Sequence, residues 1–325
     1  MHIHPRQLEE TYNTPPMKNP GILTMIRAPF LSSIIAPVFA GTLVAFSITG
    51  YLNIAGFLLV TIIGIGLHAA TNVYNDIYDT LQGTDKVNVH RNESSGGSGV
   101  LLDNPGLTGQ MFFLARAGLV IAFAGTAILT FFIDPGLRPY LWTLFLLSAF
   151  FSKYYTAPPF KLAYRGLGEV SVWFAFGPMA VLIAAIGQGI SFHPQVLMLM
   201  PATGLSTSSI LLVGQMIDLE ADRAGGKHGV ASRKGPRFAS LMYLAVQAAI
   251  IINVLFIALV YPGISWVFLL ILIPYILIFP GAAAIVTRHH DQPGELKKGA
   301  KLTVLIHLAF SFLLLATLVV YILIN

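Results

Sequence analysis

Long apolar stretches, separated by short polar connections, set the pattern of hydrophobic and polar positions along the chain. Most of them reach the ~20 residues that an α-helix needs to cross the hydrocarbon core of a bilayer. The pattern therefore predicts an all-α, polytopic membrane protein with nine transmembrane helices. The predicted spans are Leu23–Gly50, Ile54–Tyr78, Thr108–Ile133, Leu137–Tyr155, Glu169–Ile190, Gln195–Ile217, Phe238–Tyr261, Ile264–Thr287 and Lys301–Ile324.

Composition agrees with a membrane location. Of the 325 residues, 55% are hydrophobic and 10% are charged, whereas a soluble domain has about 25% charged residues. The chain has no cysteine, which excludes disulfides, thiolate metal sites and catalytic thiols. Residues 1–22 are predicted to be a polar cytoplasmic segment without a cleavable signal pattern, and residues 23–325 a single transmembrane domain.

Positive charge is unevenly distributed among the connections between the predicted spans. Of the 19 Lys and Arg residues, only Arg138 falls in a connection that follows an odd-numbered span. The positive-inside rule then places the N-terminus in the cytoplasm and the C-terminus outside. This asymmetry accounts for the net charge of +5 without a nucleic-acid partner. Because the chain is short and shows no transit segment, we expect a prokaryotic inner membrane.

Acidic residues cluster at the cytoplasmic ends of two predicted spans. Asn72, Asn75, Asp76 and Asp79 share one helical face at the end of the second span, and Asp85 follows. A carboxylate at membrane depth costs roughly 2.5–3.5 kcal/mol by insertion scales unless it is paired or bound to a cation. This face is therefore expected to point into the bundle rather than toward lipid.

A second cluster ends the sixth predicted span. Gln215, Asp218 and Asp222 repeat the i, i+3, i+7 spacing, which predicts a similar face on a continuous helix. Sets of carboxylate and amide oxygens suit hard cations, above all Mg²⁺ when a phosphate supplies further ligands. Solvated interfacial carboxylates are the alternative interpretation. Two clusters on one membrane side, each beside basic residues, favour the metal site.

Basic residues near these clusters are candidates for binding a phosphate group. Lys227 and Arg223 lie nearest the second cluster, Arg91 follows the first, and Lys153 and Arg165 lie in the connection between them. Lys and Arg beside a metal-bound diphosphate would stabilise charge on a departing phosphate group. The alternative for most of them is the ordinary positive-inside role.

The two acidic motifs together make the sequence similar to the UbiA superfamily of intramembrane prenyltransferases. The resemblance covers nearly the whole chain and is carried by Asn75–Asp79, Gly83-Thr84-Asp85, Asp218–Arg223 and Gly226-Lys227. It implies nine helices around a central cavity open to the cytoplasm, and transfer of an isoprenyl group from its diphosphate. It also implies that Asn75, Asp76, Asp79, Asp85, Asp218 and Asp222 hold Mg²⁺.

Within that superfamily, three segments resemble the 1,4-dihydroxy-2-naphthoate branch of menaquinone synthesis. They are Asp79–Asp85 by its spacing, Ser95–Leu101, and Tyr164–Glu169 with Phe176–Pro178. The segment Tyr155–Pro159 is closer to chlorophyll and archaeal lipid members, so another acceptor stays open. The implied partners are a polyprenyl diphosphate, an aromatic acceptor and membrane lipid, and no obligate protein partner is evident.

The resemblance also suggests roles for individual residues. Asp76, Asp79, Asp218, Asp222 and Lys227 would be catalytic. Asn72, Arg91, Lys153, Tyr155, Arg165 and Arg223 would bind substrate. A non-catalytic prenyl-diphosphate binder or transporter is the rival from another class.

One histidine, His68, precedes the core of the first motif by two helical turns. A hydrogen-bonded core histidine is the ordinary interpretation of such a residue. A place on the wall of the cavity is the alternative.

Overall fold

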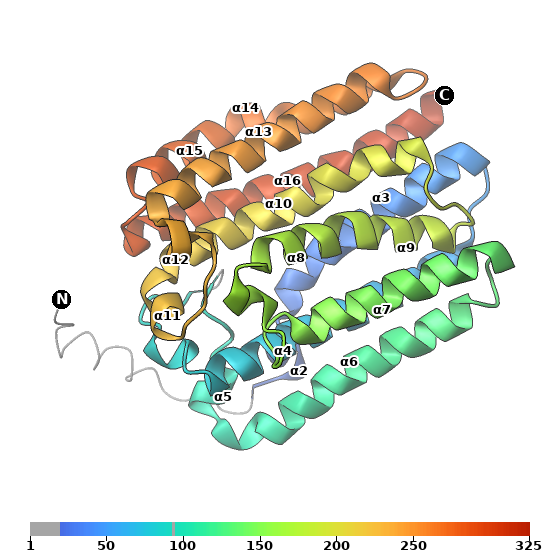
Figure 1. Cartoon of the computed structure of the whole chain (residues 1–325). Coiled ribbons are helices and arrows are strands. Elements are labelled where there is room, and N and C mark those ends of the chain that lie inside the picture. The colour runs from blue at the N-terminus through green and yellow to red at the C-terminus, as the bar shows by residue number, and fades with distance from the viewer. Residues whose placement is uncertain (1–19, 93–94) are drawn as a thin grey trace.

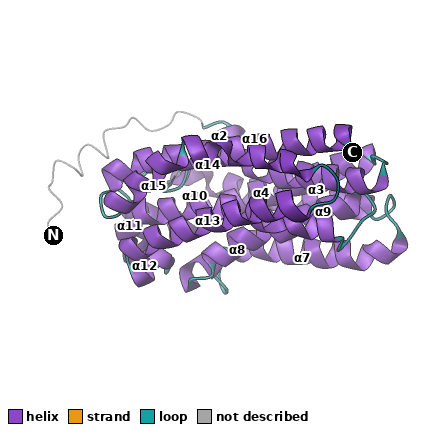
Figure 2. Cartoon of the chain, turned by 90° about the horizontal axis from the view of Figure 1, so that it is seen from above, coloured by secondary structure: helices purple, strands orange, loops and turns teal. Residues whose placement is uncertain are grey.

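The computed structural model of the chain describes residues 20–92 and 95–325, in which every regular element is a helix (Figures 1 and 2). The long helices run side by side and the loops gather at the two ends of the bundle. The predicted all-α class is confirmed, whereas most of the predicted N-terminal segment, residues 1–19, lies outside the described residues.

The principal helices are α3 (Ser32–Thr49), α4 (Ile54–Leu81), α6 (Thr108–Leu129), α7 (Arg138–Tyr154), α8 (Gly168–Phe174), α9 (Ala180–Gly187), α10 (Pro194–Ile217), α13 (Pro236–Val260), α14 (Ile273–Leu277), α15 (Phe279–Arg288) and α16 (Pro293–Ile324). The shorter elements are α2 (Ile22–Met25), η1 (Ala28–Leu31), η2 (Asp85–Val87), α5 (Val100–Asp103), η3 (Pro105–Leu107), η4 (Pro135–Leu137), η5 (Leu162–Arg165), η6 (Ala175–Met179), α11 (Leu219–Ala224), α12 (Val230–Lys234) and η7 (Ser265–Leu272).

Seven helical segments in the described ranges are long and apolar enough to cross a membrane. An eighth segment is a pair, Ser265–Leu277 and Phe279–Arg288, that bends by 43° where Pro280 follows the break. The remaining predicted span coincides with α7, whose 17 residues make it slightly shorter than the others. Each predicted span thus coincides with helical structure, and the number of nine membrane crossings stays a prediction.

The first predicted span does not form one continuous helix. The chain enters through α2, turns at Arg27 with a left-handed backbone (φ +53°), and continues through η1 before α3 begins at Ser32. Pro29 contributes to this break, because a proline disfavours α-helical geometry at the residue before it. As a result, the Arg27 side chain points to the acidic end of the bundle instead of following a membrane helix.

Small residues let the helices that carry the first acidic cluster pack closely. A Cβ atom added to Gly66 on α4 would lie 2.7 Å from the carbonyl oxygen of Gly118 on α6, and the reverse substitution would lie equally close to Gly66. Backbones approach this closely in membrane helices only where side chains are small. The paired glycines therefore fix α4 against α6 and, with it, the orientation of the acidic face.

The helical segment from α8 to α9 is interrupted by an irregular turn, η6. Pro178 lies in the π-helical turn η6, where the proline ring cannot donate the hydrogen bond of a regular helix. Phe176 is in the same turn and faces the interior. The irregularity thus lies on the wall of the cavity described below.

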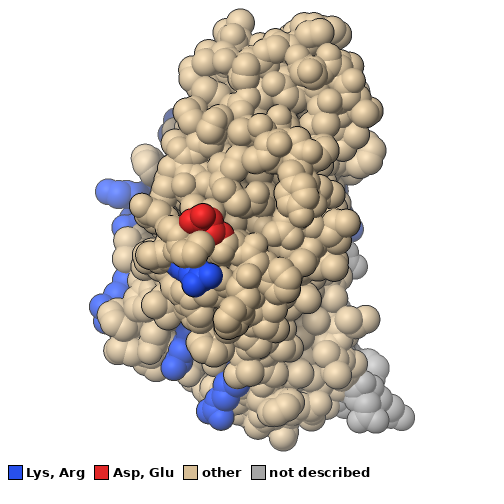
Figure 3. Space-filling model, turned by 90° about the vertical axis from the view of Figure 1, so that its right-hand side faces the viewer, with Lys and Arg blue, Asp and Glu red and all other residues tan. Residues whose placement is uncertain are grey.

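The two ends of the bundle differ in charge. Figure 3 looks onto the end opposite the acidic clusters, where one small red patch adjoins one small blue patch near the middle, and the other blue side chains in view lie along its left and lower edges. The connections at this end contain Asp134 and Arg138 as their only Asp, Glu, Lys or Arg residues. Most of the basic residues lie toward the other end, together with α5, α11 and α12 (Figure 1). The positive-inside rule predicts that this basic end is cytoplasmic.

Candidate active site

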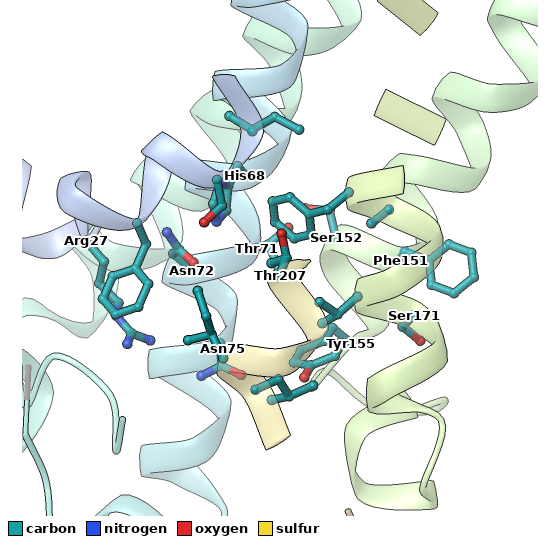
Figure 4. A pocket seen from close by; sticks show the side chains of 18 of the residues that line it. Arg27, His68, Thr71, Asn72, Asn75, Phe151, Ser152, Tyr155, Ser171 and Thr207 are labelled. Carbon is teal, nitrogen blue, oxygen red and sulfur yellow. The ribbon is translucent and has the colours of Figure 1, made fainter. Parts of the chain in front are cut away.

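A cavity of about 260 Å³ opens among α4, α7, α8 and α10 at the basic end of the bundle (Figure 4). Residues from both acidic clusters line it, so the two clusters face one space rather than lipid. The predicted site residues on its wall are Asn72, Asn75, Asp79, Asp85, Tyr155, Asp218, Asp222 and Lys227.

Asp79 is the most extensively bonded carboxylate of the site. Its Oδ2 accepts from Lys227 Nζ at 2.8 Å, and its Oδ1 accepts from the Tyr164 hydroxyl at 2.7 Å. The Tyr164 oxygen also lies 2.8 Å from Thr84 Oγ1. Asp79 lies on the last full turn of α4, so these bonds join the helix end to the segments that follow α7 and α11. The carboxylate is held in one orientation before any ligand arrives.

Asp76 lies one turn earlier and is almost fully buried. Its Oδ1 accepts from the Ser98 backbone N–H at 3.1 Å and lies 3.7 Å from Arg27 Nη1, whereas its Oδ2 has no hydrogen-bond partner among the described residues. A buried carboxylate oxygen without a partner is unfavourable unless something else, such as a cation, binds it. Asp76 is therefore a chemically suitable metal ligand.

The glycine-rich loop packs directly on the first acidic cluster. Gly97 has φ +74°, and a Cβ atom at this position would lie 2.8 Å from Asp85 Oδ2 and 3.3 Å from Asp76 Oδ1. Only glycine allows both the backbone conformation and the close approach. Burial raises the pKa of Asp85 to about 8, and the neighbouring charges of Asp79 and Asp76 act in the same direction.

The second cluster is built differently from the expectation of a continuous helix. α10 ends at Ile217, Asp218 joins it to the short helix α11, and Asp222 lies on α11. The predicted i, i+3, i+7 face is therefore interrupted, and Gln215 donates to Glu169 Oε1 at 2.9 Å. The physical reason is the buried Glu169 carboxylate, which also accepts from the backbone at the start of α12.

The two carboxylates of the second cluster have different surroundings. Asp218 Oδ1 accepts from Asn88 Nδ2 at 2.8 Å, whereas no side-chain hydrogen bond of Asp222 is found among the described residues. Burial raises the pKa of Asp218. It raises that of Asp222 to about 8, although Lys227 opposes the shift. Without a cation, Asp222 thus holds a proton at neutral pH.

Lys227 supplies positive charge between the two clusters. Its backbone N–H donates to Asp222 O at 2.7 Å, and its side chain reaches Asp79. Burial lowers the pKa of this ammonium, but the negative charges of Asp79 and Asp222 outweigh that effect and hold the pKa well above its ordinary value. Lys227 is therefore a fixed cation on the wall of the cavity.

Four of the predicted substrate-binding residues do not reach this cavity. Arg223 and Arg165 are exposed, and Arg165 donates to a backbone carbonyl in its own loop. Lys153 Nζ lies 5.1 Å from the centre of the Tyr154 ring. Arg91 lines a neighbouring pocket with Arg27, and its guanidinium packs against Gly99.

Several residues of the site were not singled out from the sequence. Arg27 and Asn88 each contact an acidic residue but lie outside any motif, so neither gives a local signal. Tyr164 belongs to the segment that resembles the naphthoate branch, which is the signal that could have identified it. Glu169 ends the same segment and is also a carboxylate at the start of an apolar span.

The donor set fits a divalent metal that shares its ligands with a substrate. No group of three or more Asp, Glu or His side chains in residues 20–92 and 95–325 lies close enough to hold an ion alone. Mg²⁺ commonly takes one or two carboxylates and completes its shell with water and substrate phosphates. The carboxylates and amides on the cavity wall match that chemistry.

Comparison with known proteins gives a consistent result. Residues 34–305 match the UbiA prenyltransferase family. A 2-carboxy-1,4-naphthoquinone phytyltransferase of Synechocystis is 27% identical over 301 residues, which is 90% of this chain and 91% of that protein. A 1,4-dihydroxy-2-naphthoate octaprenyltransferase of Mycobacterium tuberculosis is 29% identical, covering 67% of this chain and 71% of its own. Among solved structures, a UbiA homologue from Archaeoglobus fulgidus bound to DMAPP and Mg²⁺ has a similar fold, with a TM-score of 0.62 and 16% identity over 91% of this chain and 99% of that one.

Proposed function

The chain belongs to the UbiA prenyltransferase family and is a membrane-embedded prenyltransferase, and we propose that it transfers a polyprenyl group from its diphosphate to 1,4-dihydroxy-2-naphthoate with the help of Mg²⁺. The observation that carries this proposal is the single cavity that both acidic clusters line. The names of the relatives that match most of the chain support the naphthoate as acceptor. With loss of CO₂, the product would be a demethylmenaquinol, the reduced form of a demethylmenaquinone.

The acidic end of the cavity is suited to the diphosphate of the donor. Asp76, Asp79 and Asp85 with Asn75 would hold metal on one side, and Asp218 with Asp222 on the other. Mg²⁺, when bound there, would neutralise charge on the diphosphate as a Lewis acid. Lys227 lies between the two clusters and would stabilise the negative charge that the diphosphate gains as it leaves.

The remaining walls are suited to the organic part of the reaction. The allylic C–O bond breaks with both electrons going to the diphosphate, and a ring carbon of the acceptor forms the new bond to the allylic carbon. That ring carbon then loses the group it carried, as a proton or as CO₂. Phe151, Tyr155 and Phe176 line the cavity, and their ring faces would stabilise an allylic cation. The apolar walls would keep water from capturing it.

A reconstituted assay tests the proposal. The purified protein in lipid nanodiscs, given Mg²⁺, a labelled polyprenyl diphosphate and 1,4-dihydroxy-2-naphthoate, is expected to form a prenylated dihydroxynaphthalene and release one diphosphate per product. Asp222→Asn is the matched inactive variant. An exposed control, Glu220→Gln on the same short helix, is expected to retain activity.

Two results would contradict the proposal in different ways. Transfer of the prenyl group to another acceptor, with none to the naphthoate, would overturn the acceptor assignment and leave the prenyltransferase chemistry. Full activity of Asp222→Asn, or activity unchanged by removal of divalent metal, would overturn the assigned role of the acidic clusters.

A further inference from the structure

Beyond the charged end, the cavity has a band of uncharged polar side chains. We call these residues the polar band: His68, Thr71, Asn72, Ser152 and Thr207. Figure 4 shows them gathered around one space, with those of α4 facing those of α7 and α10. The band begins one helical turn from the metal ligands, at Asn72, and extends away from them to His68, which precedes Asp76 by eight residues, or about 12 Å along α4. Beyond it the walls are apolar, formed by residues such as Val60 and Ile183.

Most hydrogen-bond donors of the polar band are already used within the protein. Thr71 Oγ1 and Ser152 Oγ both donate to the carbonyl oxygen of Leu67, at 2.8 and 3.0 Å. Asn72 Nδ2 donates to the carbonyl oxygen of Ile26 at 3.1 Å. A hydroxyl whose O–H already donates still offers oxygen lone pairs, and the Asn72 amide keeps its carbonyl oxygen and one further N–H. The band therefore presents mainly acceptors to whatever occupies the cavity.

His68 is the member of the band without any internal hydrogen bond. Its ring makes an edge contact with Phe176, at 4.8 Å between centroids, and neither ring nitrogen has a partner among the described residues. His307 is also buried within a long apolar helix, but it lies away from the cavity. Its Nδ1 forms a hydrogen bond with Ser206 Oγ at 2.9 Å. The expectation that His68 is a satisfied core histidine is wrong, and the cavity-wall alternative is correct.

We propose that the polar band, with His68 at its centre, binds the hydroxyl groups of the aromatic acceptor and so selects its reduced, dihydroxy form over the quinone. This inference rests on the proposed function, and it adds the residues that recognise the acceptor and the oxidation state that they accept. A dihydroxy ring brings O–H donors that match the free lone pairs of the band. A quinone offers only carbonyl acceptors, for which the band holds few donors, the ring N–H of His68 and the second amide N–H of Asn72, and the hydroxyl lone pairs of Thr71, Ser152 and Thr207 would stay unpaired.

The other occupant of the cavity, the prenyl tail, does not explain the polar band. A polyprenyl chain carries only C–H groups beyond its diphosphate, so it would bury the His68 nitrogens without a partner. Polar groups buried in this way are unfavourable, and binding sites with such groups reject ligands that cannot pair with them. The band lies between the diphosphate end and the apolar end, where an acceptor ring must approach the allylic carbon.

Separate kinetics for donor and acceptor test the inference. His68→Leu is expected to raise KM for the dihydroxy acceptor about tenfold or more, because an acceptor hydroxyl loses its partner, and to leave KM for the prenyl diphosphate unchanged. His68→Gln restores a donor and an acceptor and is expected to recover most of the affinity. His307→Leu, a matched change in a buried histidine away from the cavity, should leave both KM values unchanged.

A second measurement changes the acceptor and compares the wild type with His68→Leu. Monomethyl ethers of the acceptor are expected to bind at least about tenfold more weakly than the parent compound, and His68→Leu should remove most of that penalty at one of the two positions. The quinone form, kept oxidised, should neither react nor compete with the dihydroxy form.

The outcomes separate this inference from the proposed function. A rise in donor KM with unchanged acceptor KM would overturn the inference and assign His68 to the tail, as would competition by the quinone at equal affinity. If the wild type uses an acceptor other than the naphthoate, the proposed function fails. The same KM measurements are then made with that acceptor. The inference is overturned if that acceptor carries no hydroxyl group.

Discussion

The two acidic clusters face the same cavity but are held in contrasting ways. In the first, Asp76 and Asp79 lie on one long helix, and Asp79 is fixed by Lys227 and Tyr164. In the second, the helix breaks at Asp218, and the Asp222 side chain has no hydrogen bond among the described residues. The first cluster is thus preorganised, whereas the second depends on the ligand for its final arrangement. A site of this kind can bind the donor diphosphate first at the preorganised first cluster. The carboxylates of the second cluster can then complete the site from the opposite side.

Removing one carboxylate from each cluster should give the largest effects and should separate activity from stability. Asp79→Asn and Asp222→Asn are both expected to lower kcat by at least about 10²-fold, because each removes a charge that binds metal. Asp79→Asn should also lower the free energy of unfolding by about 3 kcal/mol, since it leaves Lys227 without its buried partner.

Asp222→Asn should unfold like the wild type when metal is absent. Its carboxyl has a pKa of about 8 and is therefore largely protonated at pH 7, so the amide is a close substitute. Thermal unfolding in detergent with chelator, measured beside activity, checks both variants. Equal destabilisation by the two substitutions would contradict the contrast between the clusters.

The hydroxyl of Tyr164 should account for a smaller part of the preorganisation. Tyr164→Phe is expected to lower activity about 10-fold to 100-fold, the usual effect of removing a residue that orients a metal ligand. Because the role is positioning, apparent affinity for Mg²⁺ should fall while affinity for the acceptor stays the same. A uniform loss of folded protein, with normal kinetics in the remainder, would indicate a purely structural role.

Proton and metal binding should compete at Asp85 and Asp222. Burial raises both pKa values to about 8, so between about pH 4 and pH 8 the folded protein holds protons that the unfolded chain has lost. Without metal, the free energy of unfolding should therefore fall as pH rises through that window, and the contribution should be complete only below about pH 4.

Mg²⁺ binding displaces these protons, so its affinity should increase up to about tenfold for each pH unit and each proton released, levelling off above pH 8. Unfolding curves at several pH values, with and without Mg²⁺, measure both trends. An Mg²⁺ affinity that does not change between pH 6 and 8 would be inconsistent with protonated carboxyls in the metal-free site.

The basic residues that point away from the cavity should give the smallest effects. Arg223→Ala and Arg165→Ala are expected to change activity less than about twofold, since surface charges contribute little. Lys227→Met, which removes the cation between the clusters, serves as the contrasting variant and should abolish activity. A large loss in Arg223→Ala would mean that the exposed arginine turns into the cavity when substrate binds.

The first cluster could be predicted from the sequence in detail, because a continuous helix converts spacing directly into a common face. Asn72, Asn75 and Asp79 line the cavity as that spacing requires, whereas Asp76 is not among the lining residues and is buried against the Ser98 backbone. The helical spans could be predicted equally well, because their length and hydropathy are local properties of the sequence.

The second cluster could be predicted only in part, because the break at Asp218 depends on tertiary contacts. Gln215, Asp218 and Asp222 all line the cavity, but Gln215 donates to Glu169, and Asn88 reaches Asp218 across 130 positions of sequence. Arg27 joins the site through a left-handed turn that no periodicity indicates. Basic residues near a motif were also poor guides, since long side chains at an interface extend toward solvent as readily as toward a cavity.

Anomalous diffraction from crystals grown with Mn²⁺ and an unreactive prenyl thiodiphosphate would locate the metal and the diphosphate together. We expect manganese peaks that join the diphosphate to Asp76 or Asp79 on one side and to Asp218 or Asp222 on the other, inside this cavity. Manganese bound elsewhere, or a diphosphate held by basic residues alone with no metal between it and the carboxylates, would contradict the assignment of both clusters.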